Sequence, residues 1–161
     1  MEKRTMRVYA DTSVYGGISD EEFAEASRVF FEQVRAGRFI VCVSPVLEEE
    51  IRGAPMAVQA LYRDVAARAE SAVLPEEAVR LQDAYLRTGV VAPQWADDAL
   101  HVAFATVSQC ALLVSWNFRH IVHYDKIAMY NAVNVVEGYS EIGIHTPEEV
   151  IEYEEEGEEG F

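Results

Sequence analysis

Residues 6–17, MRVYADTSVYGG, are the stretch around which the rest of the sequence can be organised. A short run rich in β-branched and aromatic residues ends abruptly at Asp11, and hydroxyl side chains and two glycines follow. Such a run is easily buried as a β-strand, but a carboxylate at its end is not, unless something pairs with it. Because ligands bind at the carboxyl ends of strands in open parallel α/β sheets, Asp11 is a candidate site residue. The alternative is that Asp11 only caps the turn that follows.

The size and composition are those of one globular domain. The chain has 161 residues, of which 50% are hydrophobic and 25% charged, enough for a sizeable core. The apolar runs are too short to span a bilayer, which predicts no membrane partner. The N-terminal segment MEKRTMRV has no apolar region typical of a secretory signal. Cys42 and Cys110 lie in apolar surroundings, as buried free thiols do, so a reducing cytoplasm is the expected compartment.

The net charge of −15 argues against a nucleic-acid partner, but the charge is unevenly distributed. Eight glutamates and no basic residue follow Thr146, so residues 1–146 hold 13 basic and 20 acidic side chains, a net charge of −7. We therefore expect a domain over residues 1–146 and an acidic helix or tail over residues 147–161. Part of the remaining excess of acid is explained if carboxylates gather to hold a cation.

Strand-like and helix-like segments alternate along the chain. Gly and Pro separate them, and capping signals mark several helix starts, including Ser19 with Glu22 and Thr146 with Glu149. The predicted strands are residues 6–10, 39–43, 71–74, 111–115 and 131–136. The predicted helices are residues 21–37, 45–53, 55–69, 75–88, 96–109, a short segment around 119–130, and one beginning at 147. Strands that alternate with helices predict right-handed crossovers, and therefore an α/β fold of three layers with a mainly parallel sheet of about five strands.

Three further oxygen-bearing side chains are expected at the edge of the sheet where Asp11 lies. Glu50 is on the helix entered directly from the strand 39–43, Asp98 begins the apolar helix 96–109, and Asn117 follows the strand 111–115. The carboxyl ends of parallel strands share one edge, so these side chains can meet. Carboxylate and amide oxygens suit a hard divalent cation such as Mg²⁺ or Mn²⁺. No Cys or His group has the spacing of a zinc site.

Each of these residues also has a plainer interpretation. Glu50 is one of three consecutive glutamates that water alone could surround, and Asp97 or Asp98 would suit the N-cap of the helix. Asn117 is a common turn residue. His101, one helical turn after Asp98, is either a half-buried histidine with satisfied hydrogen bonds or a general base.

The order DTSVYGG, SPVLEEEIRGAP, ADDALHVAFAT, LLVSWNFRHI resembles that of the PIN domains, over about residues 6–136. These are metal-dependent ribonucleases that include the VapC-like toxins of toxin–antitoxin pairs. The resemblance implies a PIN-like fold with Asp11, Glu50 and Asp98 as the acidic residues that bind metal. It also implies that Ser13 is the hydroxyl that positions the site. Asn117 falls where many members have a fourth aspartate, a departure that lowers the negative charge of the site.

The resemblance therefore implies hydrolysis of phosphodiester bonds in single-stranded RNA with Mg²⁺ or Mn²⁺. In a type II toxin–antitoxin pair the partner would be a small antitoxin protein, and a homodimer is the common assembly of the family. The alternative is a catalytically weak or inactive PIN-like module that binds RNA or a protein. A dehalogenase-type phosphatase is disfavoured, because it needs an acid where Ser13 stands.

Contacts with RNA are expected from residues close to these acids in sequence. Arg52, Arg119 and Lys126 are candidates to meet the phosphate backbone. Tyr15 and Trp116 flank the acids and could stack on unpaired bases or, alternatively, pack in the core.

Overall fold

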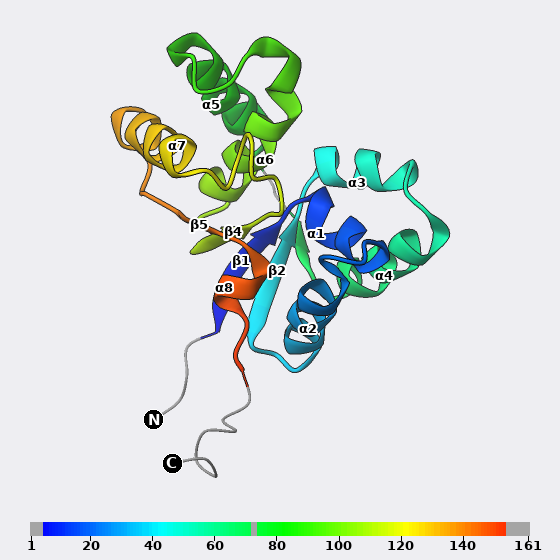
Figure 1. The fold of residues 1–161 in the computed structure, drawn as a ribbon. Coiled ribbons are helices and arrows are strands. Elements are labelled where there is room, and N and C mark those ends of the chain that lie inside the picture. The colour runs from blue at the N-terminus through cyan, green and yellow to red at the C-terminus, as the bar shows by residue number, and fades with distance from the viewer. Residues whose placement is uncertain (1–4, 72–73, 154–161) are drawn as a thin grey trace.

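The computed structural model describes residues 5–71 and 74–153, which form a five-stranded sheet between two layers of helices (Figure 1). The strands are β1 (Met6–Ala10), β2 (Phe39–Val43), β3 (Glu70–Ser71), β4 (Leu112–Val114) and β5 (Gly143–His145). All pairs are parallel and the order is β3-β2-β1-β4-β5. The first strand of the chain is therefore the central strand of the sheet.

The helices lie on both faces of the sheet. They are α1 (Thr12–Gly16), α2 (Ala24–Arg35), α3 (Pro45–Arg52), α4 (Met56–Ala66), α5 (Pro75–Thr88), α6 (Ala96–Val107), α7 (Tyr124–Val136) and α8 (Pro147–Val150), with 3-10 turns η1 (Gly17–Ser19) and η2 (Pro93–Trp95). One core packs α5, α6 and α7 against the sheet, and the other packs α1, α2, α4 and the apolar side of α3 (Figure 1). The predicted α/β class with three layers and a parallel sheet is confirmed.

Most helix boundaries follow the local sequence signals. Ser44 caps α3 by accepting a hydrogen bond from the Leu47 N–H, and Pro45 begins the helix. Gly89 ends α5 with a φ of 81°, a conformation that glycine adopts without strain. Within the described residues, no helix has the length and apolar character needed to cross a membrane.

The prediction of a strand over residues 131–136 is wrong, because this segment is the second half of α7. Its valines favour a strand locally, but Tyr130, Val133 and Asn134 share the buried side of a helix. Asn134 donates to Thr106 Oγ1 at 3.2 Å and accepts from the Tyr85 hydroxyl, so both ends of its buried amide are satisfied. The fifth strand is β5 instead. The predicted strand at 71–74 is confirmed only as the short β3, and residues 72–73 lie outside the described part.

The capping box predicted at Ser19 and Glu22 is also wrong. Ser19 ends η1, and α2 begins at Ala24 without a side-chain cap. The Glu22 N–H donates instead to Asp20 Oδ1 at 2.8 Å, which closes a turn before the helix. The box predicted at Thr146 and Glu149 is confirmed, in the short α8.

The C-terminal residues that the structure describes pack against α2. Ile151 is buried in the same core as α2, and the Gln33 side chain bonds both the N–H and the carbonyl of Glu152, at 2.9 and 2.7 Å. The domain boundary at residue 146 stays a prediction, and residues 154–161 of the acidic tail lie outside the described part.

Gly17 lies where no larger residue fits. A Cβ atom there would come within 2.5 Å of Ser27 Oγ and 2.9 Å of Trp116 Nε1, two atoms that hydrogen-bond each other at 2.9 Å. We expect Gly17→Ala to lower the free energy of unfolding by about 1–3 kcal/mol in urea titrations, because the packed pair must shift. Gly16→Ala is the matched control, since Gly16 is helical and has nothing within 4 Å of its Cβ position. Equal effects of the two substitutions would contradict this account.

Candidate functional site

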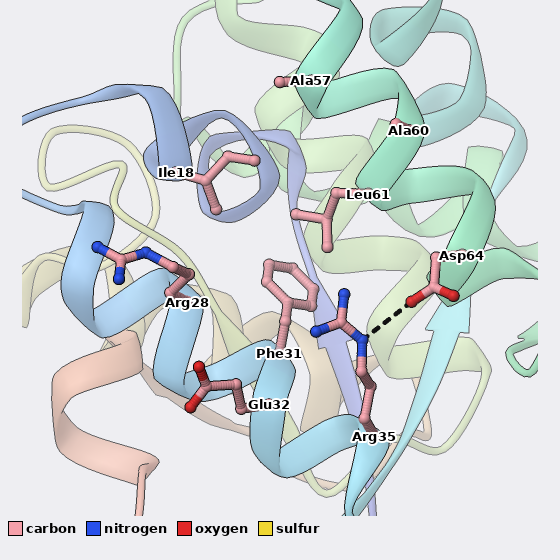
Figure 2. Close-up of a pocket in the computed structure, with 9 residues that line it drawn as sticks. All are labelled: Ile18, Arg28, Phe31, Glu32, Arg35, Ala57, Ala60, Leu61 and Asp64. Atoms are coloured by element: carbon pink, nitrogen blue, oxygen red, sulfur yellow. Dashed lines mark hydrogen bonds and ion pairs between the residues drawn. The ribbon is translucent and has the colours of Figure 1, made fainter.

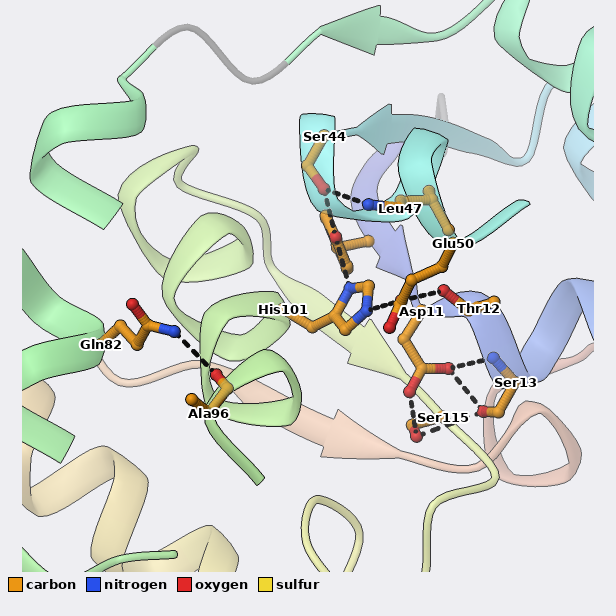
Figure 3. Close-up of polar contacts among 11 residues, drawn as sticks. Asp11, Thr12, Ser13, Ser44, Leu47, Glu50, Gln82, Ala96, His101 and Ser115 are labelled. Atoms are coloured by element: carbon orange, nitrogen blue, oxygen red, sulfur yellow. Dashed lines mark hydrogen bonds and ion pairs between the residues drawn. The ribbon is translucent and has the colours of Figure 1, made fainter. Parts of the chain in front are cut away.

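Asp11 lies at the carboxyl end of the central strand and is 3% exposed. Its carboxylate accepts hydrogen bonds from the Ser13 N–H at 3.1 Å and the Ser13 hydroxyl at 2.5 Å, both on Oδ1, and from the Ser115 hydroxyl at 2.6 Å on Oδ2. The bond from the Ser13 N–H caps α1. Asp11 therefore caps the turn, as one interpretation of the sequence predicts, and it also lies beside two of the other predicted site residues, Ser13 and Glu50 (Figure 3).

Burial raises the pKa of Asp11 above its ordinary value. The charge of His101 and the hydrogen bonds from Ser115 and Ser13 lower it in part, and the charge of Glu50 raises it. The protein therefore holds this carboxylate in a place where its ionised form is less stable than in water. A cation bound beside Asp11 would stabilise the ionised carboxylate.

Glu50 turns from α3 toward Asp11, whereas Glu48 and Glu49 are exposed. Its Oε1 accepts from the Thr12 hydroxyl at 2.5 Å and contacts Nε2 of His101 at 2.5 Å (Figure 3). Burial tends to raise the pKa of Glu50, but the bond and the charge of His101 outweigh it, so the pKa lies below its ordinary value. Of the three consecutive glutamates, only Glu50 has the surroundings of a site residue.

His101 connects Glu50 to the centre of the sheet. It is 2% exposed, and its Nδ1 lies 2.7 Å from the Tyr9 hydroxyl, which in turn lies 2.6 Å from the Ser44 hydroxyl. Burial lowers the pKa of His101, but the bond to Glu50 and the charges of nearby acids outweigh it and raise the pKa. Both ring nitrogens therefore have partners, as in the plainer of the two interpretations of this residue, and the protonated ring is a positive charge among the carboxylates.

Asp98 and Asn117 form the other side of the site. The Asp98 carboxylate is half-buried in the first turn of α6 and is hydrogen-bonded by the Asn117 side chain. Burial raises the pKa of Asp98, the bond from Asn117 and the charge of His120 lower it, and the charge of Asp11 raises it. Because the charge of Asp11 reaches Asp98, the two carboxylates are electrostatic neighbours.

The capping interpretation of the acids at 97 and 98 is wrong, because Trp95 occupies the N-cap position of α6 and no side chain caps that helix end. The turn interpretation of Asn117 is confirmed. Its Oδ1 accepts from the N–H groups of His120 and Arg119 at 2.9 and 3.3 Å, so it shapes the loop after β4 as well as contacting Asp98.

The predicted site residues come together in two connected groups. In the first, Asp11 is bonded by Ser13 and by Ser115, and the charge of Glu50 reaches it. In the second, Asn117 bonds Asp98, which the charge of Asp11 reaches. Across the described residues, no three or more His, Cys, Asp or Glu side chains form a group that could hold a metal ion by themselves. Mg²⁺ is usually bound through one or two carboxylates with water and substrate phosphate, and the oxygen donors of Asp11 and Asp98 fit that mode.

Sequence reasoning missed two hydroxyl side chains of this site. Ser115 directly follows β4 and Thr12 comes two residues after β1, and each donates to a site carboxylate. A small hydroxyl residue close to the end of a buried strand was the available signal, whereas Ser13 was singled out by the resemblance to the PIN domains.

Of the two interpretations of Tyr15 and Trp116, stacking on bases is wrong, because both side chains are buried. Tyr15 is fully buried against Phe31, with ring centroids 4.8 Å apart, and Trp116 is 7% exposed and stacks on Phe23 at 4.3 Å. These two aromatic side chains therefore belong to the core, as the alternative interpretation holds.

The three predicted phosphate contacts differ in availability. The Lys126 ammonium donates to the Val90 carbonyl at 2.5 Å, and Arg52 is exposed but lies 3.9 Å from Glu48 on its own helix. Arg119 is exposed, and its guanidinium forms no ion pair with any residue that the structure describes. Arg119 is therefore the best placed of the three to meet an anion.

A separate groove of about 430 Å³ lies between α2 and α4 (Figure 2). Apolar side chains of Ile18, Phe31 and Leu61 line it, and charges of both signs lie around them, including Arg35 paired with Asp64 at 3.0 Å. It contains none of the predicted site residues.

Comparisons with protein-family models and with curated proteins gave no match. Among solved structures, the fold is similar to that in the crystal structure of VapBC2 from Rickettsia felis bound to a DNA fragment from their promoter. The TM-score is 0.54 and the sequence identity 10%, over 88% of this chain and 98% of that chain. At this identity the similarity concerns the fold alone. It agrees with the PIN-like arrangement of three layers that the sequence predicts.

Proposed function

We propose that the protein is a ribonuclease that uses Mg²⁺ or Mn²⁺ to hydrolyse phosphodiester bonds of single-stranded RNA. The observation that carries the proposal is the buried Asp11 carboxylate at the end of the central strand, with Glu50, Asp98 and Asn117 around it. A nearly buried carboxylate with a raised pKa, beside other acids, is typical of a functional site.

Asp11 and Asp98 would hold the metal ion directly, and Glu50 would join them on release from His101. A bound divalent ion lowers the pKa of a coordinated water and stabilises charge on the phosphate. The hydroxyls of Ser13 and Ser115 keep the Asp11 carboxylate in one orientation, and the Asn117 side chain does the same for Asp98. The hydrogen bond from Thr12 orients Glu50.

The partner that we propose in the cell is a small antitoxin protein, since the fold is shared with a VapBC complex. The groove between α2 and α4 suits a short amphipathic segment of such a protein, because its floor is apolar and its edges carry both charges. A homodimer and a cytoplasmic location remain predictions from the sequence.

The direct test is cleavage of structured and unstructured RNA with Mn²⁺, comparing the wild type with Asp11→Asn. Removing the charge of a metal ligand forfeits several kcal/mol of transition-state stabilisation, so we expect the rate on unstructured RNA to fall about a thousandfold. Cleavage that persists in the variant would mean a contaminant or a different site.

The competing function is a PIN-like module that binds RNA or a protein without cleaving it. The bond between Glu50 and His101 favours it, because it occupies one acid of the site, and so does an amide at position 117. In the same experiment, RNA binding by both proteins without cleavage by either would support this module over the nuclease.

A further inference from the structure

An exposed pair of stacked rings lies beside the site. Trp95 ends η2 and comes three residues before Asp98, and its indole stacks on the imidazole of His120, with centroids 4.3 Å apart and planes inclined by 24°. Trp95 is 39% exposed, whereas Trp116 is 7% exposed. One face of the indole meets His120, so the exposure of Trp95 is expected on the other face and the edge of the ring.

The backbone around Trp95 is held from two sides. The Trp95 N–H donates to the Ala92 carbonyl at 2.9 Å, which closes η2. Gln82 on α5 donates its side-chain amide to the carbonyl of Ala96, the next residue, at 2.8 Å (Figure 3). A ring whose backbone is fixed in this way loses little freedom when a ligand stacks on it.

His120 is fixed in the same manner and is tied to the site. Its N–H donates to Asn117 Oδ1 at 2.9 Å, and its carbonyl accepts from the Tyr130 hydroxyl at 2.9 Å. The Asn117 side chain also bonds Asp98, and the charge of His120 reaches that carboxylate. The stacked pair therefore adjoins the Asp98–Asn117 side of the site.

Stacking suits the electrostatics of this protein. With a net charge of −15 the chain repels the RNA backbone, so phosphate contacts alone give little affinity. Stacking between a base and an aromatic ring does not depend on net charge, and every unpaired base offers a flat face. Arg119, next to His120 and exposed, is positioned to meet the phosphate of a stacked nucleotide.

We propose that the Trp95–His120 pair is a base-binding subsite, where one unpaired base of the RNA stacks on the open face of Trp95 while a neighbouring phosphate lies at the acids. The proposal rests on the proposed function, since it assigns part of the same substrate. A different role for the stack would be to hold the loop after β4 against the start of α6, and the experiment below separates the two roles.

The test measures binding of a labelled single-stranded RNA oligonucleotide to the full chain at low ionic strength with EDTA, which prevents metal-dependent cleavage. Trp95→Ala is expected to raise the Kd about tenfold, and Trp95→Phe, which keeps a flat ring, less than threefold. The control is Tyr124→Ala, which removes an aromatic ring that is 87% exposed at the start of α7. It is expected to leave the Kd unchanged.

A double-mutant cycle identifies the stacked base. A single abasic position is moved along the oligonucleotide, and at one position it should weaken binding to the wild type about tenfold without weakening binding to Trp95→Ala further. Effects that add at every position would overturn the proposal, because a structural tryptophan does not couple to one base. In Mg²⁺, Trp95→Ala should raise KM about tenfold and leave kcat within twofold.

The wild type supplies a readout that does not depend on the folding of a variant. Because Trp116 is buried, quenching of tryptophan emission by the oligonucleotide should report on Trp95, and it should be lost at the coupled abasic position. A wild type that cleaves RNA with no such quenching overturns the subsite and leaves the nuclease intact. A wild type that neither binds nor cleaves RNA overturns both.

Discussion

His101→Ala is expected to lower the free energy of unfolding by about 2–4 kcal/mol, measured in urea at pH 6 with EDTA. The substitution removes the imidazole from both of its partners, so Glu50 loses its counter-charge and the buried Tyr9 hydroxyl loses a hydrogen bond. Breaking a buried ion pair by deleting one partner costs about 3–5 kcal/mol. The Glu50 side chain is 34% exposed, so water compensates part of that loss. The expected loss is therefore the smaller range given first, about 2–4 kcal/mol.

The same variant should change how stability depends on pH. The pKa of His101 is raised in the folded protein, so its contribution is complete below the ordinary histidine pKa of about 6.5 and is lost as the pH rises through the folded value. The difference in unfolding free energy between the wild type and His101→Ala should therefore shrink above about pH 6.5. Glu50→Gln is the matched control, because it keeps a hydrogen-bonding group at position 50 and removes only the charge. It therefore separates the effect of the ion pair from that of the hydrogen bond. A difference that is constant from pH 5 to 9 would contradict the ion pair.

Asp11→Asn is expected to have opposite effects on stability and on metal binding. In EDTA at pH 7 the variant should be more stable by on the order of 1 kcal/mol, a gain typical of substitutions that relieve a strained active site. The sign follows from the raised pKa of Asp11. Its ionisation destabilises the folded protein as the pH rises from the ordinary value of about 4 through the folded one. An asparagine keeps an oxygen that can accept from Ser13 and removes the charge.

Added Mg²⁺ or Mn²⁺ should make the wild type more stable than Asp11→Asn, the reverse of the order in EDTA. At a metal concentration of a hundred times its Kd, the wild type should gain about 2.7 kcal/mol, whereas Asp11→Asn should gain little. The thermal midpoint, measured with and without EDTA, reports both effects. Glu49→Gln serves as the control, because Glu49 is an exposed acid one residue from Glu50 and should respond to metal like the wild type. A wild-type midpoint that millimolar metal leaves unchanged would count against the metal site.

The fold was predictable where local signals and burial agree. Asp11 after an apolar run, Pro45 after Ser44 and Gly89 after a helical repeat each mark a boundary through backbone chemistry that does not depend on distant residues. The segment 131–136 was not predictable in this way. Its valines favour a strand, and the helix is stabilised by Tyr85 and Thr106, which meet Asn134 only after the chain has folded.

The site was predictable to the level of the acidic residues but not of their contacts. The spacing indicates that Asp11, Glu50 and Asp98 reach one edge of the sheet. It does not reveal that His101 lies at that edge with both nitrogens bonded, because a histidine in an apolar helix has the same pattern whether its partner is a carboxylate or a backbone group. Tyr15 and Trp116, the aromatic residues that the sequence offers beside the site, are buried in the core. Trp95, three residues before Asp98, is exposed instead.

The central position of β1 has a consequence for the order in which the protein assembles during synthesis. Asp11 and Glu50 are synthesised before β4, so β1 has only β2 beside it until β4 has been made. The Ser115 hydroxyl that holds the Asp11 carboxylate is 104 residues further along the chain. A nascent chain that stops before β4 lacks Ser115 and cannot form the site. Once Ser115 has been made, closing so long a loop is still slow relative to local folding. Whatever chemistry this edge performs begins only after the chain has been made through Asn117.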